Sequence, residues 1–313
     1  MDQGSRIYVA GHNGLVGSAI VRRLEAEGCQ NLILRSHGEC DLENQGAVFK
    51  LFLEEKPEFV IMAAAKVGGI MANSTYPVDF IRSNLMVQNN IIDASHFSGV
   101  KKLLFLGSSC IYPKLAPQPI KEEYLLSGDL EPTNEWYAIA KIAGIKMCQA
   151  YHAQHGLNAI SLMPTNLYGQ GDNFDLSSSH VLPALLRKFH EAKLSGAHEV
   201  VMWGTGTPRR EFLHVDDLAD ACLHLIRHYD SPEIINVGTG EDLTIRELAE
   251  LVKATVGFEG EIVQDLTKPD GTPRKQLDVT RLHAQGWHHR IALQDGIRST
   301  YQWFLDHQAS LRC

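Results

Sequence analysis

The sequence lacks long apolar runs, and its positive charge is scarce. Its 313 residues contain no apolar stretch of the roughly 18 residues that a membrane-spanning helix needs. No charged leader with a cleavage site precedes the first strand pattern. Lys and Arg number 29 against 37 Asp and Glu, a net charge of −8 without a basic stripe. We therefore expect a cytoplasmic protein that binds neither membrane nor nucleic acid, and any anionic ligand needs a local cluster of cations.

Cysteines are few and widely spaced. No C-x-x-C pair occurs, which argues against a zinc cluster and against the disulfide framework of a small secreted domain. No H-E-x-x-H or comparable spacing indicates a metal site. One thiol has an unusual setting, because Cys110 follows Ser108 and Ser109 at the end of an apolar run in LFLGSSCIYP. The six cysteines are Cys29, Cys40, Cys110, Cys148, Cys222 and Cys313.

The first half alternates short β-branched runs with longer helical patterns. The runs are almost continuously apolar, as expected for strands covered on both faces of a sheet. This order predicts βαβ units and an α/β fold with a doubly wound parallel sheet. The expected strands span 6–10, 31–35, 59–65, 101–107 and 158–164, and the expected helices span 15–27, 43–55, 78–98 and 137–155.

The second half is less regular. We expect it to supply a smaller C-terminal substrate lobe over the carboxyl edge of the sheet, where doubly wound folds hold ligands. Thr244 and Gly257 are the expected cap and stop of a helix over 243–257. Other expected elements are a helix over 179–193, a strand over 199–204, a helix from near Asp216 and a strand over 235–240. The expected domains are a nucleotide-binding domain over 1–170, to which 213–256 returns, and a substrate-binding lobe from 171–212 and 257–313.

Three glycines follow the first expected strand in the run GHNGLVG. Gly11, Gly14 and Gly17 stand where a helix begins. Glycines let the backbone approach a pyrophosphate, and the helix N-terminus presents free N–H groups and partial positive charge. The triplet also fits a plain tight turn, but its place between a strand and a helix favours a dinucleotide site.

The tip of the second expected strand indicates which dinucleotide is bound. An acidic residue there would favour NAD, but the sequence has Arg35 with His37 nearby, which suits the 2′-phosphate of NADP. An arginine that only caps the strand end in solvent is the alternative. Asp41 and Leu42 are expected to meet the adenine edge, and the small residues of 63–69, Ala64 among them, to line the middle of the cofactor.

A tyrosine and a lysine share one face of the helix expected over 137–155. Tyr137 and Lys141 are four residues apart, and a lysine there can lower the pKa of the phenol and make it an acid or base. The pair Y-x-x-x-K is common by itself. Combined with the glycine loop and Ser108 at the end of the fourth strand, it resembles the extended short-chain dehydrogenase/reductase superfamily, in which Ser108 would bond the same substrate oxygen as Tyr137.

Longer motifs make the resemblance more specific. The motifs are GSSCIYPK (107–114), EPTNEWYAIAKIAGIK (131–146), MPTNLYG (163–169), SHVLPALLRKFHEA (179–192), WGTGTPRREFLHVDD (203–217) and KPDGTPRK (268–275). With them the chain resembles the GDP-L-fucose synthase family, which epimerises GDP-4-keto-6-deoxymannose at C3 and C5 and reduces it at C4 with NADPH. The likeness implies a homodimer in which the helices over 78–98 and 137–155 form a bundle.

The resemblance assigns roles to individual residues. Catalysis falls on Ser108, Cys110, Tyr137, Lys141 and His180, with Cys110 and His180 as the epimerising acid and base. The expected substrate contacts are Ser109, Asn166, Lys188, Trp203, Arg210 and Asp270. The expected cofactor contacts are Gly11, Asn13, Gly14, Leu15, Val16, Gly17, Arg35, His37, Asp41, Leu42, Ala64, Leu106, Gly107, Ser108, Tyr137, Lys141, Pro164, Asn166, Leu167 and His180.

The chain departs from the family at three positions. Asn13 and His37 stand where the family commonly has arginine, so one expected phosphate contact is missing and the NADP prediction depends on Arg35. Trp136 replaces the proline that often precedes the tyrosine, and leaves Tyr137 and Lys141 in register.

Other functions remain open at this point. A nucleotide-sugar epimerase or dehydratase that recycles bound NAD would share the glycines and the Tyr137–Lys141 pair, but would not need Cys110 with His180. A non-catalytic NADP-binding regulator would tend to lose the tyrosine or the lysine. A related GDP-keto-sugar, such as a 6-deoxyheptose, is also open as the substrate. Taken singly, Cys110 fits a buried thiol and His180 a helix cap.

Overall fold

A six-stranded sheet forms the centre of the larger domain. In a computed structural model of the protein, residues 1–176, 178–268 and 270–308 are described, so Cys313 and the end of the expected lobe (309–313) lie outside them. All sheet neighbours pair in parallel, in the order β10-β5-β4-β3-β1-β2. The doubly wound α/β fold is thereby confirmed. The strands are β1 (Ile7–Ala10), β2 (Leu32–Ile33), β3 (Phe59–Met62), β4 (Lys102–Leu106), β5 (Ala159–Pro164) and β10 (Ile235–Val237).

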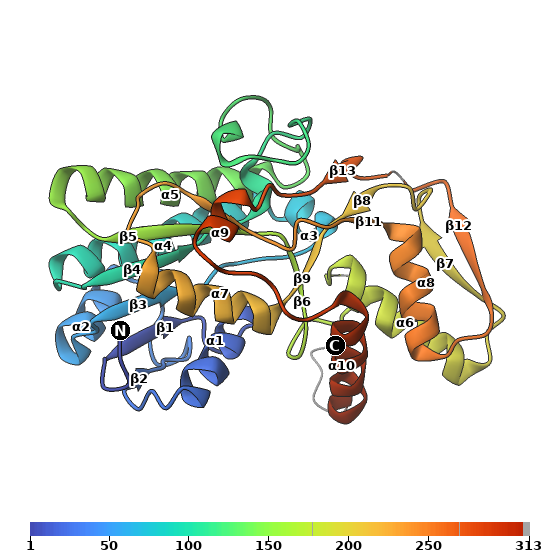
Figure 1. Ribbon diagram of the computed structural model, residues 1–313, viewed down its shortest axis with the longest axis horizontal. Helices are drawn as coiled ribbons and strands as arrows, with labels where there is room; N and C mark the ends of the chain where they lie inside the picture. The colour runs from blue at the N-terminus through green and yellow to red at the C-terminus, as the bar shows by residue number, and fades with distance from the viewer. Residues whose placement is uncertain (177, 269, 309–313) are drawn as a thin grey trace.

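Helices cover both faces of this sheet (Figure 1). One layer holds α1 (Leu15–Ala26) and α7 (Val215–His228), which contact each other. The other holds α2 (Gln45–Glu55), α4 (Pro77–Phe97) and α5 (Glu135–His155), with α4 and α5 side by side. Because both faces are covered, the strands are buried along nearly their whole length and read as continuous apolar runs.

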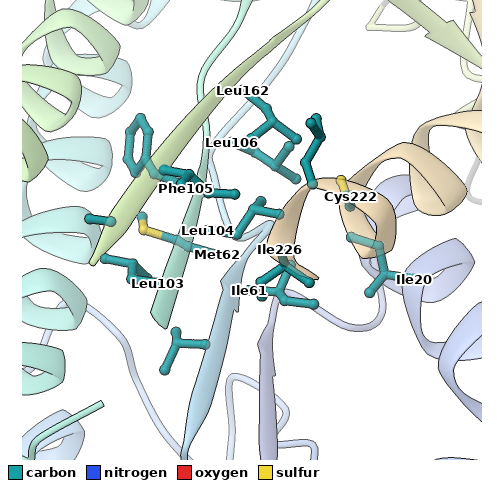
Figure 2. Close-up of a cluster of buried hydrophobic side chains, with 14 of the residues drawn as sticks. Ile20, Ile61, Met62, Leu103, Leu104, Phe105, Leu106, Leu162, Cys222 and Ile226 are labelled. Carbon is teal, nitrogen blue, oxygen red and sulfur yellow. The ribbon is translucent and has the colours of Figure 1, made fainter. Parts of the chain in front are cut away.

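The core between the sheet and its first helical layer shows this burial directly. Figure 2 shows Cys222 and Ile226 of α7 and Ile20 of α1 packed against the strand residues Ile61 and Leu104. All five side chains are at most 2% exposed. Cys222 therefore acts as a small apolar residue of the core, which agrees with the absence of any cysteine motif in the sequence.

A second core holds the smaller lobe together, at the right of Figure 1. It forms where α6 packs against α8 and β7 pairs in parallel with β12. Thr244 and Glu247 make a capping box at the start of α8, and Gly257 ends it with a positive φ of 71°, both as expected. The elements are α6 (Val181–Ser195), β7 (Glu199–Trp203), α8 (Ile245–Val256), β12 (Glu261–Asp265) and α10 (Leu293–His307).

The two packing cores divide the chain differently from the expected domains in two places. The segment 213–256 returns to the large domain only as far as β10, because α8 packs in the second core through Leu248 and Val252. Conversely, Leu277, Leu282 and Trp287 belong to the first core, so part of 257–313 lies on the large domain. Apolar periodicity predicts a helix but does not show which of two cores it faces.

Short strands connect the two domains. One sheet has the order β11-β8-β13, and β6 pairs in parallel with β9. No helix among the described residues is long and apolar enough to cross a membrane. The remaining elements are α3 (Ile70–Thr75), η1 (Ser109–Ile111), η2 (Glu122–Tyr124), β6 (Asn166–Tyr168), β8 (Arg209–Arg210), β9 (Phe212–His214), β11 (Leu243–Thr244), β13 (Arg274–Lys275) and α9 (Thr280–Ala284).

Candidate active site

The glycine loop between β1 and α1 requires glycine at two positions. Gly11 has a φ of +82°, and a Cβ there would lie 2.7 Å from the Cα of Ala64. A Cβ at Gly17 would lie 2.0 Å from the carbonyl oxygen of Gly11. Gly14 precedes the helix and has no side chain to cap it, so the first-turn N–H groups face outward for an anion. The loop therefore fits a pyrophosphate, as the sequence predicts.

The loop residue His12 adds an independent sign of a ligand. Its Nδ1 atom is buried and has no hydrogen-bond partner among the described residues. Buried polar atoms are almost always satisfied, so this atom is open to a partner from outside the protein, either water or a bound dinucleotide.

The tip of β2 is less open to a phosphate than the sequence suggests. Arg35 forms an ion pair with Glu55, and its Nη1 donates to the carbonyl of Leu34 at 2.8 Å. His37 has an 86% exposed side chain and lies 3.8 Å from Asp41. The 2′-phosphate of NADP would thus have to compete with Glu55 for the Arg35 guanidinium. Next to this tip, the carbonyl of Leu42 accepts from Asn90 at 2.9 Å.

Cys110 lies just beyond the carboxyl end of β4. Ser108 caps η1, and its Oγ accepts a hydrogen bond from the backbone N–H of Cys110 at 3.3 Å. Gly107 is pressed against Met163, where a Cβ would lie 2.5 Å from the Cε of that methionine. Ser109 is 4% exposed and lies in the same short turn. The turn holds Ser108 and Cys110 next to α5, which it contacts.

Tyr137 and Lys141 lie on α5, the helix that this turn contacts. Lys141 is 2% exposed, and its Nζ donates to the carbonyl of Leu106 at 2.8 Å and lies 5.7 Å from the centre of the Tyr137 ring. Burial lowers the pKa of Lys141 to about 8. Burial and the neighbouring Cys110 raise the pKa of Tyr137. The protein around Tyr137 thus acts against the expected lowering, and the phenol keeps its proton near neutral pH.

His180 approaches from the other domain. It is the N-cap residue of α6, and the loop before it is attached to the start of α3 by a hydrogen bond from Gly69 N to the carbonyl of Ser178 at 3.1 Å. The side chain is accessible to solvent, yet the surrounding protein and the charge of Lys275 lower its pKa. The imidazole is therefore neutral at pH 7.

Lys275 links the two halves of the site. Burial raises the pKa of the Cys110 thiol, and the charge of Lys275 is the largest effect that opposes this rise. The charge of Lys275 also lowers the pKa of His180. Burial lowers the pKa of Lys275 itself, and its protonated form influences both Cys110 and His180, which are remote from each other in the chain. Sequence reasoning gave Lys275 no role, although it stands in the quoted run KPDGTPRK.

A group of cations continues from Lys275 into the lobe. Arg210 is its partner in the pairing of β8 with β13, and its Nη1 donates to the carbonyl of Thr272 at 2.6 Å. Lys188 of α6 lies 5.3 Å from the centre of the Trp203 ring, and Lys268 lies 5.4 Å from it. Trp203 is 55% exposed. These side chains thus provide local positive charge for an anionic ligand, although the net charge of the chain is −8.

Two other expected contacts have local structural roles. Asp270 accepts hydrogen bonds from the backbone N–H and hydroxyl of Thr205, at 2.9 and 2.7 Å. Asn166 donates from Nδ2 to the carbonyl of Glu211 at 2.8 Å, just after the end of β5 at Pro164 and next to Leu167 in β6. No group of three or more His, Cys, Asp or Glu side chains suited to a metal ion occurs among the residues that the structure describes.

Comparison with known proteins identifies relatives over nearly the whole chain. The chain matches the NAD dependent epimerase/dehydratase family over residues 7–238. It is 63% identical over 304 residues to GDP-L-fucose synthase 1 of Arabidopsis thaliana, covering 97% of this chain and 94% of the relative. Its fold resembles a GDP-L-fucose synthetase from Naegleria fowleri bound to NADP, with a TM-score of 0.93, 31% identity, and 100% and 96% of the two chains covered.

A second solved structure is similar over almost the same length. A GDP-6-OMe-4-keto-L-xylo-heptose reductase from C. jejuni has a TM-score of 0.94 and 43% identity, with 98% of this chain and 99% of that chain covered. The identity over the whole chain is higher for the fucose synthase from Arabidopsis thaliana. The chain belongs to the NAD dependent epimerase/dehydratase family and, within it, to the GDP-L-fucose synthases.

Proposed function

We propose that the protein converts GDP-4-keto-6-deoxy-D-mannose to GDP-L-fucose, as an NADPH-dependent 3,5-epimerase and 4-reductase. The observation that carries this proposal is that the turn with Cys110 packs against α5, which bears Tyr137 and Lys141, while the charge of Lys275 acts to lower the pKa of both Cys110 and His180. A simple 4-epimerase or dehydratase would not need this second pair. The fucose synthase relatives, similar over nearly the whole chain, support the same substrate.

The epimerisation requires a proton to leave one face of the sugar and another to arrive on the opposite face. The 4-ketone acidifies the C–H bonds at C3 and C5, so a base removes a proton and an enolate forms. A raised thiol pKa at Cys110 and a lowered imidazole pKa at His180 leave this pair with one proton to give and one vacant basic nitrogen. Each inversion needs one group that removes a proton and one group that returns a proton. Lys275 favours negative charge nearby and would stabilise the enolate.

The reduction uses Tyr137 as the proton donor. Its raised pKa keeps the phenol protonated, so Tyr137 Oη can protonate the alkoxide that forms at C4, and Ser108 Oγ can bond the same oxygen. NADPH, when bound, supplies the hydride to C4. Lys141 is held by the carbonyl of Leu106 and directs its ammonium group toward the Tyr137 ring.

The cofactor and the sugar nucleotide each have a fitting set of residues. The Gly11–Gly17 loop and the first turn of α1 would hold the pyrophosphate of NADP, with His12 Nδ1 and Arg35 as further partners. Lys188 and Arg210 would bind the diphosphate of GDP, Trp203 would stack on the nucleotide, and Asp270 and Asn166 would complete the pocket.

We also propose that the protein is a cytoplasmic homodimer. The supporting feature is the α4–α5 pair, which covers one side of the sheet and on which Val78 and Phe97 are 66% and 69% exposed. Light scattering coupled to gel filtration measures the mass of the particle, and a monomer at micromolar concentration would contradict this part.

The main test is a single assay with product analysis. The purified protein is mixed with GDP-4-keto-6-deoxymannose and NADPH, absorbance at the nicotinamide band is followed, and the product is identified by NMR. Stoichiometric loss of NADPH with formation of GDP-L-fucose supports the proposal. No net loss of NADPH would indicate a recycling epimerase. Faster turnover of a GDP-4-keto-6-deoxyheptose would indicate a heptose substrate, as the name of the C. jejuni reductase states for that protein.

A further inference from the structure

The sheet β11-β8-β13 sorts its side chains onto two faces. Arg209 is in register with Arg274, and Arg210 with Lys275, so each pair points to its own side of the sheet. Arg210 and Lys275 share one side of the sheet, and the charge of Lys275 acts to lower the pKa of both Cys110 and His180. Arg209 and Arg274 lie on the opposite side, where they would repel each other without an anion between them.

Asp242 is that anion. Its side chain is 4% exposed, and its Oδ1 accepts from Arg209 Nε at 2.8 Å while its Oδ2 accepts from Arg274 Nε. Its backbone carbonyl accepts from Arg209 Nη2 at 2.9 Å. Asp242 directly precedes β11, so it lies two residues before Thr244, which is in register with Arg209. One buried carboxylate, directly before β11, thus binds an arginine of β8 and an arginine of β13.

The carboxylate has no role in the proposed chemistry. We propose that Asp242 is a positioning residue, which holds β13 in register with β8 and thereby places Lys275 and Arg210 in the active site. The effect of Asp242 on catalysis rests on the proposed function. Its effect on the position of β13 does not. The strands β8 and β13 are only two residues long, so backbone hydrogen bonds alone would hold them together weakly. A side-chain clamp is therefore needed to keep their register.

A second carboxylate holds the neighbouring segments from inside. Glu211 is 0% exposed and accepts from the backbone N–H groups of Thr239, Gly240 and Leu277, at 2.6, 2.9 and 2.8 Å. Glu211 fixes the chain two residues after Lys275, whereas Asp242 fixes the residue before it. Loss of Asp242 therefore frees the β13 end while Glu211 keeps the rest of the segment attached, which makes partial displacement of Lys275 the expected result.

The test compares Asp242→Asn with the unchanged enzyme. Asparagine keeps the shape but loses the charge and presents N–H groups to one arginine. The pH dependence of Cys110 alkylation by iodoacetamide, resolved by mass spectrometry of its peptide, reports whether Lys275 remains near the thiol. We expect the midpoint to rise by about one pH unit and the KM for the GDP-sugar to rise about tenfold, with NADPH binding unchanged. Asp242→Glu, which keeps the charge, should recover part of both.

Two further variants keep the outcome decisive. Arg274→Gln removes the arm of the clamp whose side chain is 44% exposed, so it should fold and show the same changes in smaller size even if Asp242→Asn does not fold. Asp220→Asn is the matched control, because Asp220 pairs with Arg23 at 2.9 Å and with Trp287 Nε1 at 2.8 Å on the large domain. Asp220→Asn should change neither the midpoint of Cys110 alkylation nor the KM for the GDP-sugar.

The alkylation profile separates this inference from the proposed function, since it needs no substrate. If the unchanged enzyme turns over no GDP-4-keto-6-deoxymannose, the proposed function fails, and the profile still tests the position of Lys275. If both clamp variants fold and leave the midpoint and the KM as they were, or lower only the melting temperature, Asp242 is a structural residue and the inference is wrong.

Discussion

The Nζ atom of Lys141 donates a hydrogen bond to the backbone carbonyl oxygen of Leu106 across 2.8 Å. Burial at this position lowers the pKa of Lys141 to about 8. The ammonium form is therefore lost as the pH rises through 8. We expect the rate of NADPH consumption to fall over this interval, because the Tyr137 site then loses its positive charge. A pH–rate profile with saturating substrates measures it, and a rate that stays constant well above pH 8 would contradict the assignment.

The same burial affects stability with a defined sign. In the unfolded chain the pKa returns toward 10.5, so the unfolded state binds more protons than the folded state between about 8 and 10.5. The contribution of Lys141 to the free energy of unfolding therefore increases with pH in this window. Its charge destabilises the fold below pH 8, which is a price in stability typical of functional lysines.

Replacement of Cys110 separates the two activities. In Cys110→Ser we expect exchange of the C3 and C5 hydrogens with solvent deuterium to fall by about a hundredfold or more, since one acid/base group is lost. Reduction of the un-epimerised ketone should continue, because Tyr137 and Lys141 are unchanged. Deuterium uptake is followed by NMR and hydride transfer by NADPH absorbance. Cys29→Ser is the control, because both cysteines are 7% exposed. A Cys110→Ser enzyme that still forms GDP-L-fucose would refute the role.

Replacement of Tyr137 should give the opposite pattern. Tyr137→Phe keeps the ring beside Lys141 but removes the phenolic proton, so NADPH consumption should fall by about two to three orders of magnitude. Deuterium uptake at C3 and C5 should be affected less, because Cys110 and His180 remain. Equal losses of both activities would show that Tyr137 acts in the enolate steps as well.

We predict that Glu55 affects how strongly the protein selects NADPH over NADH. Since Glu55 occupies the Arg35 guanidinium, Glu55→Gln should free Arg35 for the 2′-phosphate and raise the ratio of kcat/KM for NADPH to that for NADH. Arg35→Ala should lower that ratio by about tenfold, the effect of one charge-assisted contact. Glu54→Gln is the control, because Glu54 pairs with Lys50 at 3.9 Å on the surface of the same helix. Unchanged ratios in both test variants would place the 2′-phosphate elsewhere.

Much of the large domain could be predicted from the sequence, because its strands carry their own signal. Runs such as 59–65 are apolar on both faces, and the strand β3 appears there over Phe59–Met62. Tyr137 and Lys141 could be paired from helical spacing alone. Cys110 had a local anomaly that attracted attention, whereas His180 was identified only through the family resemblance, since an exposed histidine at a helix start has no distinctive pattern.

Two of the residues missed by sequence reasoning, Lys275 and Asp242, share one physical cause. Lys275 and Asp242 act through the pairing of β13 with β8, and these strands are two residues long. So short a strand shows no periodicity, and its partner lies about sixty residues away in the chain, where single-sequence reasoning cannot detect a contact. The misplaced boundary at α8 has the same origin, since the choice between two cores is made by long-range packing.

Trp203 provides the last prediction, on recognition of the nucleotide. It is 55% exposed, with Lys188 and Lys268 over its ring at 5.3 and 5.4 Å. Each cation–π contact at an exposed site contributes about 0.5–1 kcal/mol, and stacking on the ligand adds to this. We expect Trp203→Ala to raise the KM for the GDP-sugar by about fivefold to thirtyfold, and Trp203→Phe to raise it less.

The KM for NADPH should stay constant in both Trp203 variants, because the glycine loop belongs to the other domain. Leu194→Ala, at a side chain 73% exposed in the same lobe, controls for loss of apolar surface. If Trp203→Ala changed kcat alone, the ring would act on the geometry of the reacting sugar and not on the nucleotide. If it changed neither constant, the exposed tryptophan would have no part in binding, and the nucleotide would be held by Lys188 and Arg210 at its diphosphate alone.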